Sequence, residues 1–596
     1  MEVVHHAASD FTRIFEILHY QQTKYANAKA LNEFDEQWQG YSISETIHLV
    51  EALACWLRRQ GYKPGERIML VPVLGSAAWV VIDFACQLSG LVTVPVHATS
   101  RQEDFELIAQ ETESKLCITA DRALCEKIKL ACGNHLPVFH LEVGTPDFFN
   151  WKKETPSEQE LDELRNVTKQ IAETDWVTIL YTSGSSGISK GVPLTHQNII
   201  HNIKAILPML PLETEHSVLS FLPFSHILER MACYGYLAFG VAIYFSRSRD
   251  SVAHDFLSVR PYFCTSVPRV LEKMYDYLQA QLLTRNSIKR KLIVWAFAVA
   301  ARYKSEKQNT LLYGIQLWLV RLLVLRHWRK RLGGRLRYMV VGAASLRPEI
   351  GRMLSAAGVH VVEGYGMTET SPLISINRFE PGLNRFGTVG MIIPGVEVKI
   401  DEPDEAGAGE ILVRGPNVMT GYFKRPELNA EVFTVDGWLR TGDVGLFEKK
   451  RFLKITDRKK DIFKTSTGKY IAPQHLQSQF CQSAFIQQCL ILGFNKPFVT
   501  ALIVPNFNVL IQWCDQEHIH WTAPQYMIHN IKVRARMQQE VEAINLSISG
   551  YERVINFVLC PEEWTIERGE LTPSLKPIRQ KIMANYQSEI EKMYTS

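Results

Sequence analysis

The sequence lacks paired cysteine motifs, although it contains 11 cysteines among 596 residues. No two of them form a C-x-x-C pair and their number is odd, so neither a disulfide framework nor a cysteine zinc site is indicated. It has no H-E-x-x-H segment, and Cys514, His518 and His520 lack a matching ligand pair, which argues against a zinc site. No G-x-S-x-G segment is present, which excludes a serine hydrolase of that type. We expect free thiols in a reducing cytoplasm.

Long hydrophobic runs are also missing. The longest uncharged runs, Ile68 to Ile82 and Met231 to Ser246, are shorter than the roughly 18 to 20 residues that span a bilayer, and both contain glycine. We interpret them as buried strands and helices. Residues Met1 to Arg13 have no basic segment followed by an apolar one, so no secretory signal is predicted. We therefore expect a cytoplasmic location.

A strong net charge is absent as well. The 66 Lys and Arg residues nearly balance the 62 Asp and Glu residues, giving a formal net charge of +4. A surface that grips nucleic acid as a whole would be far more basic, so no nucleic-acid partner is predicted. With 46% hydrophobic and 21% charged residues, the composition is that of a globular protein.

Acidic residues are scarce in one stretch, Tyr277 to Pro348, where Glu306 is the sole acid. Basic residues gather there beside an apolar helical run, Leu311 to Leu325. They are Arg321, Arg326, Arg329, Lys330, Arg331, Arg335 and Arg337. A basic amphipathic helix can lie on an anionic membrane, so residues 311–337 are a candidate for peripheral contact with the inner face of a membrane. The alternative is a packed helix with a solvated basic end.

Apolar runs rich in Val and Ile alternate with helix-like stretches such as Ser44 to Gln60 and Gln102 to Thr112, which predicts an α/β fold with parallel strands. The expected strands are Arg67 to Val73, Leu91 to Val96, Val177 to Leu180, Ser217 to Leu222, Tyr338 to Val341 and Val359 to Val362. From about Gly387, shorter strands punctuated by glycine indicate a β-rich subdomain. The charged string at 457–461 separates a large N-terminal domain, 1–456, from a small C-terminal α/β domain, 462–596.

The most informative segment is Tyr181-Thr-Ser-Gly-Ser-Ser-Gly-Ile-Ser-Lys-Gly191, which follows a predicted strand. Small residues let the backbone approach a polyphosphate, N–H groups and hydroxyls donate hydrogen bonds, and Lys190 supplies charge. Ser189 stands where a Walker A loop has glycine, and Gly191 follows the lysine in place of Ser or Thr. The segment therefore predicts a phosphate-binding loop that is not a P-loop. Alone, it would equally suit a flexible turn.

Further motifs occur in a fixed order along almost the whole chain. They are Leu194-Thr-His-x-Asn198, Phe221-Leu-Pro-Phe-Ser-His-Ile-Leu-Glu-Arg230, Gly342-Ala-Ala-Ser345, Gly364-Tyr-Gly-Met-Thr-Glu-Thr370, Trp438-Leu-Arg-Thr-Gly-Asp443, Thr456-Asp-Arg-Lys-Lys460 and Gly569-Glu-Leu-Thr-Pro-Ser-Leu-Lys576. Together with the loop, the set resembles the adenylate-forming (AMP-binding) superfamily, and within it the long-chain fatty acyl-CoA synthetases.

The resemblance implies a nucleotide site. Tyr365 would stack on adenine, with Gly342, Ala343 and Ala344 on the other face and Gly364 and Gly366 beside it. Thr368 would lie near the α-phosphate, and Thr182 and Glu369 would hold Mg²⁺, a hard cation that prefers oxygen ligands. The loop residues Thr182, Ser183, Gly184, Ser185, Ser186, Gly187 and Lys190 would surround the phosphates. Asp443 and Arg458 would bind the ribose.

The resemblance also implies a two-step ligase that uses ATP, Mg²⁺ and coenzyme A. A fatty acid would attack the α-phosphorus of ATP, assisted by Lys190, Glu369, Thr368 and Lys576, and coenzyme A would then displace AMP. Lys460 would be the pivot of a hinge at 457–461, about which the C-terminal domain moves. Gly468 and Lys469 would lie on the coenzyme A side.

His226 fits a wall of the acyl pocket, and a structural histidine is nearly as good an interpretation. Two departures from the family pattern are Thr467, where glycine is common, and Pro577, which follows Lys576. Two alternatives stay open: a fatty acyl-AMP ligase that delivers to a carrier protein, and a membrane-associated scaffold that binds nucleotide or lipid without turnover. Intact Lys190, Glu369, Asp443 and Lys576 argue against the scaffold.

Overall fold

The computed structural model describes residues 11–153, 155–183, 189–283, 287–305, 311–459, 461–467, 469–572 and 577–595. Its internal contacts divide the chain into two units. The first unit consists of Met1–Pro268, Val299–Val398 and Val413–Leu439, and the second of Arg269–Ala298, Lys399–Leu412 and Arg440–Ser596. Within the described residues, no helix combines the length and apolar character needed to cross a bilayer.

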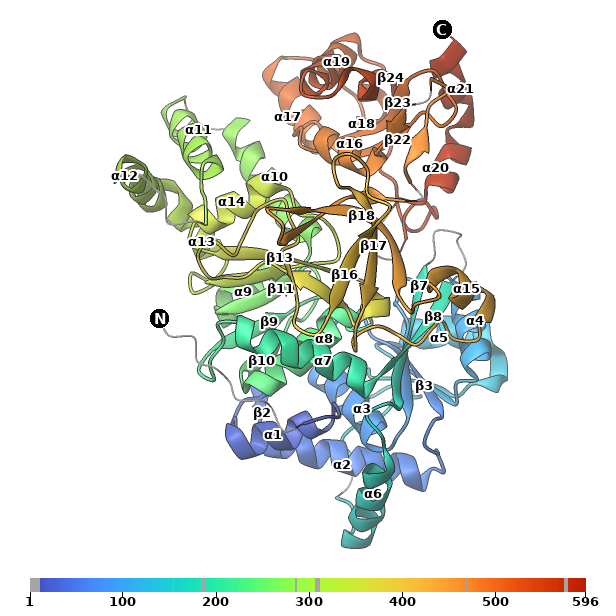
Figure 1. Cartoon of the computed structure of the whole chain (residues 1–596). Helices are drawn as coiled ribbons and strands as arrows, with labels where there is room; N and C mark the ends of the chain where they lie inside the picture. The colour runs from blue at the N-terminus through green and yellow to red at the C-terminus, as the bar shows by residue number, and fades with distance from the viewer. Residues whose placement is uncertain are drawn as a thin grey trace. The chain divides into compact units, whose positions relative to one another are not determined.

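A six-stranded sheet of the first unit carries the predicted phosphate loop. Its order is β6-β5-β3-β4-β7-β8, with all neighbours parallel except the last pair. The strands are β3 (Arg67–Val71), β4 (Val92–Pro95), β5 (Leu116–Thr119), β6 (Val138–His140), β7 (Trp176–Ser183) and β8 (Ser189–Thr195). Helices α2 (Ile43–Arg59), α3 (Ala77–Leu88), α4 (Gln102–Thr112), α5 (Arg122–Cys132) and α6 (Glu158–Gln170) occur along the same stretch (Figure 1).

One face of this sheet is covered by α4 and α5. Met69 and Val71 of β3 and Cys117 of β5 share a buried cluster with Phe105 of α4 and Ile128 of α5. Alternate residues of a strand point to opposite faces, so the short Val- and Ile-rich runs need an apolar cover on each side. Parallel strands with helical crossovers, as the sequence predicts, satisfy this requirement.

A nine-stranded sheet forms the rest of the first unit's framework. Its order is β15-β14-β13-β12-β11-β9-β10-β1-β2, and the central strands from β13 to β1 are parallel. The strands are β1 (Leu31–Asp35), β2 (Gln37–Tyr41), β9 (Ser217–Ser220), β10 (Ala242–Phe245), β11 (Phe263–Ser266), β12 (Tyr338–Val341), β13 (His360–Gly366), β14 (Leu373–Ile376) and β15 (Met391–Ile392). Its helices include α1 (Glu16–Lys24), α7 (His196–Ile206), α8 (Ile227–Phe239), α9 (Val252–Val259) and α14 (Pro348–Ala356).

A buried ion pair joins α3, which follows a strand of the six-stranded sheet, to α8, which follows a strand of the nine-stranded sheet. Arg230 of α8 lies 2.5 Å from Asp83 of α3, and both side chains are almost inaccessible to solvent. Arg230 also donates to Thr178 of β7 at 2.8 Å and to Thr93 of β4 at 3.0 Å. Tyr234 donates its hydroxyl to the same aspartate. The guanidinium therefore fixes β7, the strand that leads into the phosphate loop, against α3 and α8.

The second unit contains most of a four-stranded sheet, β16-β17-β18-β19, and a three-stranded sheet, β22-β23-β24. The strands are β16 (Glu397–Asp401), β17 (Gly409–Arg414), β18 (Leu439–Glu448), β19 (Phe452–Arg458), β22 (Ile486–Leu492), β23 (Val499–Pro505) and β24 (Val554–Leu559). A small hairpin joins β20 (Phe463–Lys464) and β21 (Tyr470–Ile471). Short strands after about Gly387 agree with the predicted β-rich subdomain.

The three-stranded sheet has helices on both faces (Figure 1). Cys489 and Ile491 of β22 face α16 (Pro473–Phe480), α17 (Phe507–Gln516) and α19 (Ile531–Asn545). Leu490 and Leu492 face the opposite cluster, which includes Ile582 of α20 (Arg579–Asn585) and Met593 of α21 (Gln587–Thr595). Strict alternation along β22 thus builds two cores, and the C-terminal segment forms a small α/β layer as predicted.

Candidate functional site

The predicted phosphate loop is the turn of the β7–β8 hairpin. Thr182 lies opposite Lys190, and Ser183 opposite Ser189, in an antiparallel register. The turn itself, with Gly184, Ser185, Ser186 and Gly187, lies outside the described residues. The ammonium of Lys190 lies 4.7 Å from the centre of the Tyr422 ring. Thr182 and Lys190 are therefore cross-strand neighbours near the ends of β7 and β8.

Contacts to a distant segment hold this hairpin in place. Phe423 donates its backbone N–H to Gly191 O at 2.8 Å. The Tyr181 hydroxyl donates to Glu111 of α4 at 2.8 Å, and Arg425 pairs with the same carboxylate. Burial and the nearby carboxylate raise the pKa of Tyr181, so its hydroxyl stays protonated as a donor. The segment around 422–425 thus contacts β8 directly, through Phe423, and β7 indirectly, through the carboxylate that Arg425 shares with Tyr181.

The motif Leu194-Thr-His-x-Asn198 is a helix start. Thr195 caps α7, accepting from the N–H of Asn198, while the Asn198 side chain accepts from the N–H of Thr195. Such a reciprocal capping box satisfies the free N–H groups of the first turn. The Asn198 amide also donates to Pro416 O at 2.7 Å and to Val418 O at 3.1 Å. The motif therefore connects β8 to the segment before Tyr422.

Glu369 lies on a short 3-10 turn, η4 (Thr368–Thr370), and is buried. Its Oε1 accepts from the Tyr422 hydroxyl at 2.8 Å, and its backbone carbonyl accepts from Met419 N at 2.9 Å. The carbonyl of Thr370 accepts from the buried amides of Asn202 at 3.2 Å and Asn417 at 3.0 Å. These bonds fix the turn, so the carboxylate is held in one place beside Thr368.

The two predicted adenine walls are neighbours in the sheet. Strand β12 ends immediately before Gly342 and pairs in parallel with β13, which contains Gly364, Tyr365 and Gly366. Carboxyl ends of adjacent parallel strands are the usual place for a ligand in such sheets. The register of β13 with β14 shifts between Tyr365 and Gly366, which makes a bulge. Bulges re-aim side chains and are common next to active sites.

Two of these positions have a restricted backbone geometry. A Cβ on residue 366 would lie 1.7 Å from Pro372 O, so only glycine lets the backbone at this position approach Pro372 so closely. Ala343 has φ of 70°, a left-handed conformation that is uncommon without glycine. Glu363 of β13 is buried and accepts from Leu346 N at 3.0 Å, and burial raises the pKa of its carboxyl to about 7. Glu363 joins β13 to the segment after Ala344.

His226 is the N-cap of α8, where its Nδ1 accepts from Leu228 N at 3.3 Å. A helix-capping role agrees with the structural interpretation of this histidine, and its predicted contact with an acyl chain stays a prediction. The next residues of the motif point into the core. Ser220 donates to the buried carboxyl of Glu229, and burial raises the pKa of that carboxyl to about 8. Glu229 is therefore protonated at neutral pH.

In the second unit, Asp443 of β18 lies opposite Arg458 of β19. The Nε of Arg458 lies 3.1 Å from Oδ1 of Asp443, which is buried. Thr441 accepts from Asp443 N at 3.1 Å and donates to Ile411 O at 2.8 Å. The two residues predicted to bind ribose are thus paired with each other on a firmly anchored hairpin.

Of the other residues that the sequence predicts for the C-terminal domain, the structure describes Lys469. Lys469 is exposed, with its ammonium 5.7 Å from the Tyr551 ring, and its N–H donates to Thr465 Oγ1 at 3.1 Å. Lys460, Gly468 and Lys576 lie outside the described residues. Leu571 and Pro577 form an antiparallel bridge, and Ile578 donates to Glu570 O at 2.8 Å. These bonds fix both ends of the segment that contains Lys576.

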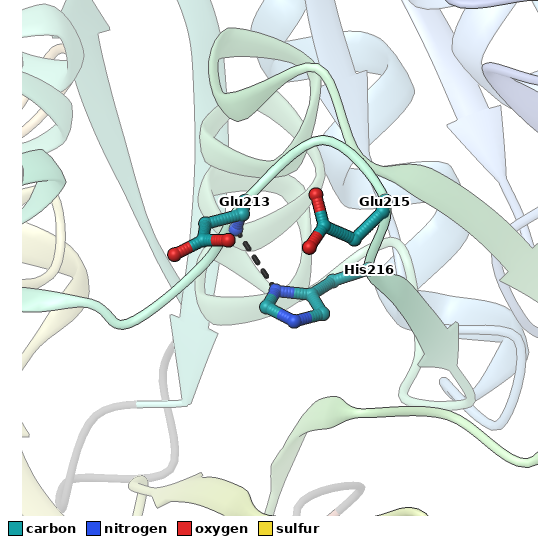
Figure 2. Close-up of side chains that lie close together, drawn as sticks. All are labelled: Glu213, Glu215 and His216. Carbon is teal, nitrogen blue, oxygen red and sulfur yellow. Dashed lines mark hydrogen bonds between the residues drawn. The ribbon is translucent and has the colours of Figure 1, made fainter.

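A separate cluster, which the sequence did not predict, contains Glu213, Glu215 and His216 (Figure 2). One ligand atom of each lies within 4.8 Å of the others. His216 Nδ1, however, accepts from Glu213 N at 3.0 Å, and its ring stacks on Tyr262 with centroids 3.5 Å apart. Both glutamates are exposed. The imidazole therefore stabilises a turn before β9, and the cluster gives no independent sign of a metal.

Comparison with known proteins identifies the class that this fold and site define. Residues 18–423 match the family model of the AMP-binding enzyme, and residues 460–596 match that of the AMP-binding enzyme C-terminal domain. The chain belongs to the AMP-binding enzyme family, which confirms the resemblance seen in its motifs.

Several relatives of the chain are named as ligases or synthetases of long-chain fatty acids or long-chain acyl-CoA. A long-chain-fatty-acid–CoA ligase of Mycobacterium bovis is 30% identical over 94% of this chain and 93% of its own. The peroxisomal long chain acyl-CoA synthetase 6 of Arabidopsis thaliana is 31% identical over 94% of this chain and 82% of its own. Among solved structures, the adenylation domain of a carboxylic acid reductase from Segniliparus rugosus, in complex with AMP and a carboxylic acid, has a TM-score of 0.73. It is 22% identical and covers 98% of this chain and 94% of that one, which confirms the predicted fold.

Proposed function

We propose that the chain ligates a long-chain fatty acid to coenzyme A through an acyl-AMP intermediate, using ATP and Mg²⁺. The observation that carries this proposal is the group formed by Lys190, Tyr422 and Glu369. The ammonium of Lys190, on β8, lies 4.7 Å from the centre of the Tyr422 ring, and the carboxylate of Glu369, on η4, accepts a 2.8 Å hydrogen bond from the hydroxyl of the same tyrosine. Polyphosphate chemistry needs such fixed charges of both signs, one for the phosphate oxygens and one for a metal.

The donor set fits Mg²⁺, because Glu369 offers a buried carboxylate and Thr182 a hydroxyl, both hard oxygen ligands. When bound, the ion would neutralise charge on the phosphates of ATP. Lys190 and the N–H groups of the loop would hold the same phosphates, and Thr368 would lie near the α-phosphate. Tyr365, Gly342, Ala343 and Ala344 would enclose the adenine.

In the first step, a carboxylate oxygen of the fatty acid attacks the α-phosphorus of ATP, and the bond to the bridging oxygen of pyrophosphate breaks. Acyl-AMP and pyrophosphate form. Two anions must approach within bonding range, so an ammonium between them lowers the barrier. We assign this role to Lys576, and the ribose contacts to Asp443 and Arg458.

In the second step, the thiolate sulfur of coenzyme A attacks the acyl carbon, and the bond from that carbon to the phosphate oxygen breaks. The thioester and AMP are released. We infer that the domain after residue 461 rotates about a hinge at 457–461 with Lys460 as its pivot, bringing Gly468 and Lys469 toward coenzyme A. The acyl chain length is proposed from the relatives' names and from the Glu229-Arg230 ending of the His226 motif.

A panel of fatty acids from short to long chains, incubated with ATP, Mg²⁺ and coenzyme A, tests this proposal. AMP, pyrophosphate and thioester are measured in the same samples. We expect all three in equal amounts, with the highest kcat/KM for long chains. Pyrophosphate without consumption of coenzyme A would instead indicate a ligase that delivers to a carrier protein. Absence of all three products would leave a non-catalytic scaffold.

A further inference from the structure

Helix α12 (Leu311–Val320) of the first unit is apolar on two opposite faces. Tyr313, Leu317 and Val320, spaced i, i+4, i+7, are buried. Leu311, Ile315 and Trp318 have the same spacing on the other face, and they are 85%, 52% and 61% exposed. A helix that is hydrophobic all round is normally buried all round. Half of this helix is instead presented to the surroundings, at the edge of the first unit (Figure 1).

The exposed apolar row continues beyond α12. A π-helical turn, η3 (Arg321–Leu325), follows without a break and leads into α13 (Arg326–Arg331). Leu322 and Leu323 of this turn are 42% and 47% exposed. Single exposed leucines are ordinary on protein surfaces, but a continuous row is not. The row therefore needs an apolar partner.

Positively charged side chains lie next to the exposed apolar row. Arg321, Arg326, Lys330 and Arg331 are exposed at its C-terminal end. Arg302, also exposed, donates to Gln316 of α12 at 2.6 Å, which brings a further positive charge beside the helix. Between Ser287 and Pro348 the sequence contains a single acidic residue, Glu306. The local charge is thus strongly positive although the whole chain is nearly neutral.

We propose that the exposed face of α12 and η3 is a membrane-docking surface that inserts into the headgroup region of a bilayer with anionic lipids. An interfacial helix of this kind places Leu, Ile and Trp among the acyl chains while Lys and Arg contact lipid phosphates. Tryptophan is typical of this depth, because its ring is apolar and its N–H is polar. A second copy of the chain fits less well, since a stable protein interface needs roughly 20 to 30 residues on each side.

Sedimentation with vesicles tests the proposal without reference to catalysis. Vesicles of phosphatidylcholine with phosphatidylserine are compared with vesicles of phosphatidylcholine alone, at low and high salt. One variant, Ile315→Asp with Trp318→Asp, removes the apolar row. A second variant, Arg326→Gln with Lys330→Gln and Arg331→Gln, removes cations. All five side chains are exposed or at the surface, so thermal unfolding should be nearly unchanged.

We expect wild type to bind the anionic vesicles and to dissociate as salt increases. The apolar variant should lose about tenfold or more in partition coefficient on both kinds of vesicle. The cationic variant should lose about fivefold for each charge removed on anionic vesicles only. Amide hydrogen exchange of residues 311–325 should slow when vesicles are added.

Matched controls replace two exposed apolar residues with Asp, or three exposed cations with Gln, at other places on the surface. Leu130→Asp with Leu546→Asp replaces two leucines that are 78% and 83% exposed. Lys115→Gln with Lys169→Gln and Lys532→Gln removes three exposed lysines. Both controls should bind vesicles as wild type does. Failure of wild type to sediment at low salt, or equal losses in test and control variants, would overturn the proposal. A dimer that forms without vesicles and that the apolar variant abolishes would also overturn it.

Discussion

The hydroxyl of Tyr422 donates a 2.8 Å hydrogen bond to Glu369, and the ring of the same tyrosine lies under the ammonium of Lys190. Burial and the carboxylate raise the pKa of Tyr422, so the hydroxyl remains a donor at every physiological pH. One side chain thereby fixes the spacing between a cation and an anion that are far apart in the sequence.

Tyr422→Phe tests this relationship. The ring stays, and a hydrogen bond to a charged, buried group is lost, for which about 1.5 to 3 kcal/mol is typical. We expect ATP–pyrophosphate exchange to fall by roughly tenfold or more, with a higher Mg²⁺ requirement, while the fold persists. Exchange rates are measured over a Mg²⁺ titration, with Glu369→Gln as a comparison that removes the charge itself. A wild-type titration curve for Tyr422→Phe would mean that the bond is not used in the reaction.

Much of this site follows from local sequence patterns. The run Tyr338 to Val341 is β12 and Gln102 to Thr112 is α4, because both patterns are short and uninterrupted. The small residues and Lys190 predict a phosphate-binding loop only together with the other motifs, and the whole set of motifs indicates the family. Such patterns can be recognised in the sequence because the apolar spacing that defines them involves residues only a few positions apart.

Tyr422, Asn202 and Asn417 were not predicted, because their partners are distant in the chain. Tyr422 and Glu369 are separated by 53 positions, and Asn202 and Thr370 by 168. No periodicity encodes such pairs. The one signal in the sequence is the position of Tyr422 between Gly421 and Phe423, a short run of glycine and aromatic residues between β17 and β18. Its significance depends on the fold that carries it to η4.

Arg230→Met should destabilise the protein strongly. The guanidinium neutralises Asp83 in a site that excludes water, so removing it leaves a buried charge, at a cost of about 3 to 5 kcal/mol. Chemical denaturation measures the free energy of unfolding. Adding Asp83→Asn should recover part of the loss. Arg122→Met, which breaks an exposed pair with Glu126, is the control and should change stability by less than about 0.5 kcal/mol.

Glu229 predicts a pH dependence of stability. Burial raises the pKa of its carboxyl from 4.5 to about 8 in the folded state. The folded protein therefore retains a proton that the unfolded chain has released, and stability falls as pH rises from about 4.5 to about 8. Glu229→Gln replaces the neutral acid with a neutral amide and should abolish this contribution. We expect the stability of the variant to rise relative to that of wild type as the pH increases from 5 to 8, as measured by thermal unfolding at each pH. A difference that is constant with pH would show that Glu229 is ionised throughout.

Lys576→Ala separates the two half-reactions. An ammonium between the carboxylate and the α-phosphate serves adenylate formation, and thioester formation does not need it. We expect acyl-AMP formation to fall by orders of magnitude, while supplied acyl-AMP and coenzyme A still give thioester. Rapid quench of each half-reaction makes the comparison. Equal loss in both would assign the lysine a structural role.

Oxygen-18 tracing tests the proposed acyl-AMP route most directly. A long-chain fatty acid labelled in both carboxylate oxygens is converted to thioester with ATP, Mg²⁺ and coenzyme A, and the products are analysed by mass spectrometry. If the carboxylate attacks the α-phosphorus, one labelled oxygen stays on AMP when the acyl carbon–oxygen bond breaks, and pyrophosphate carries none. Label in pyrophosphate or inorganic phosphate, or AMP without label, would contradict the account.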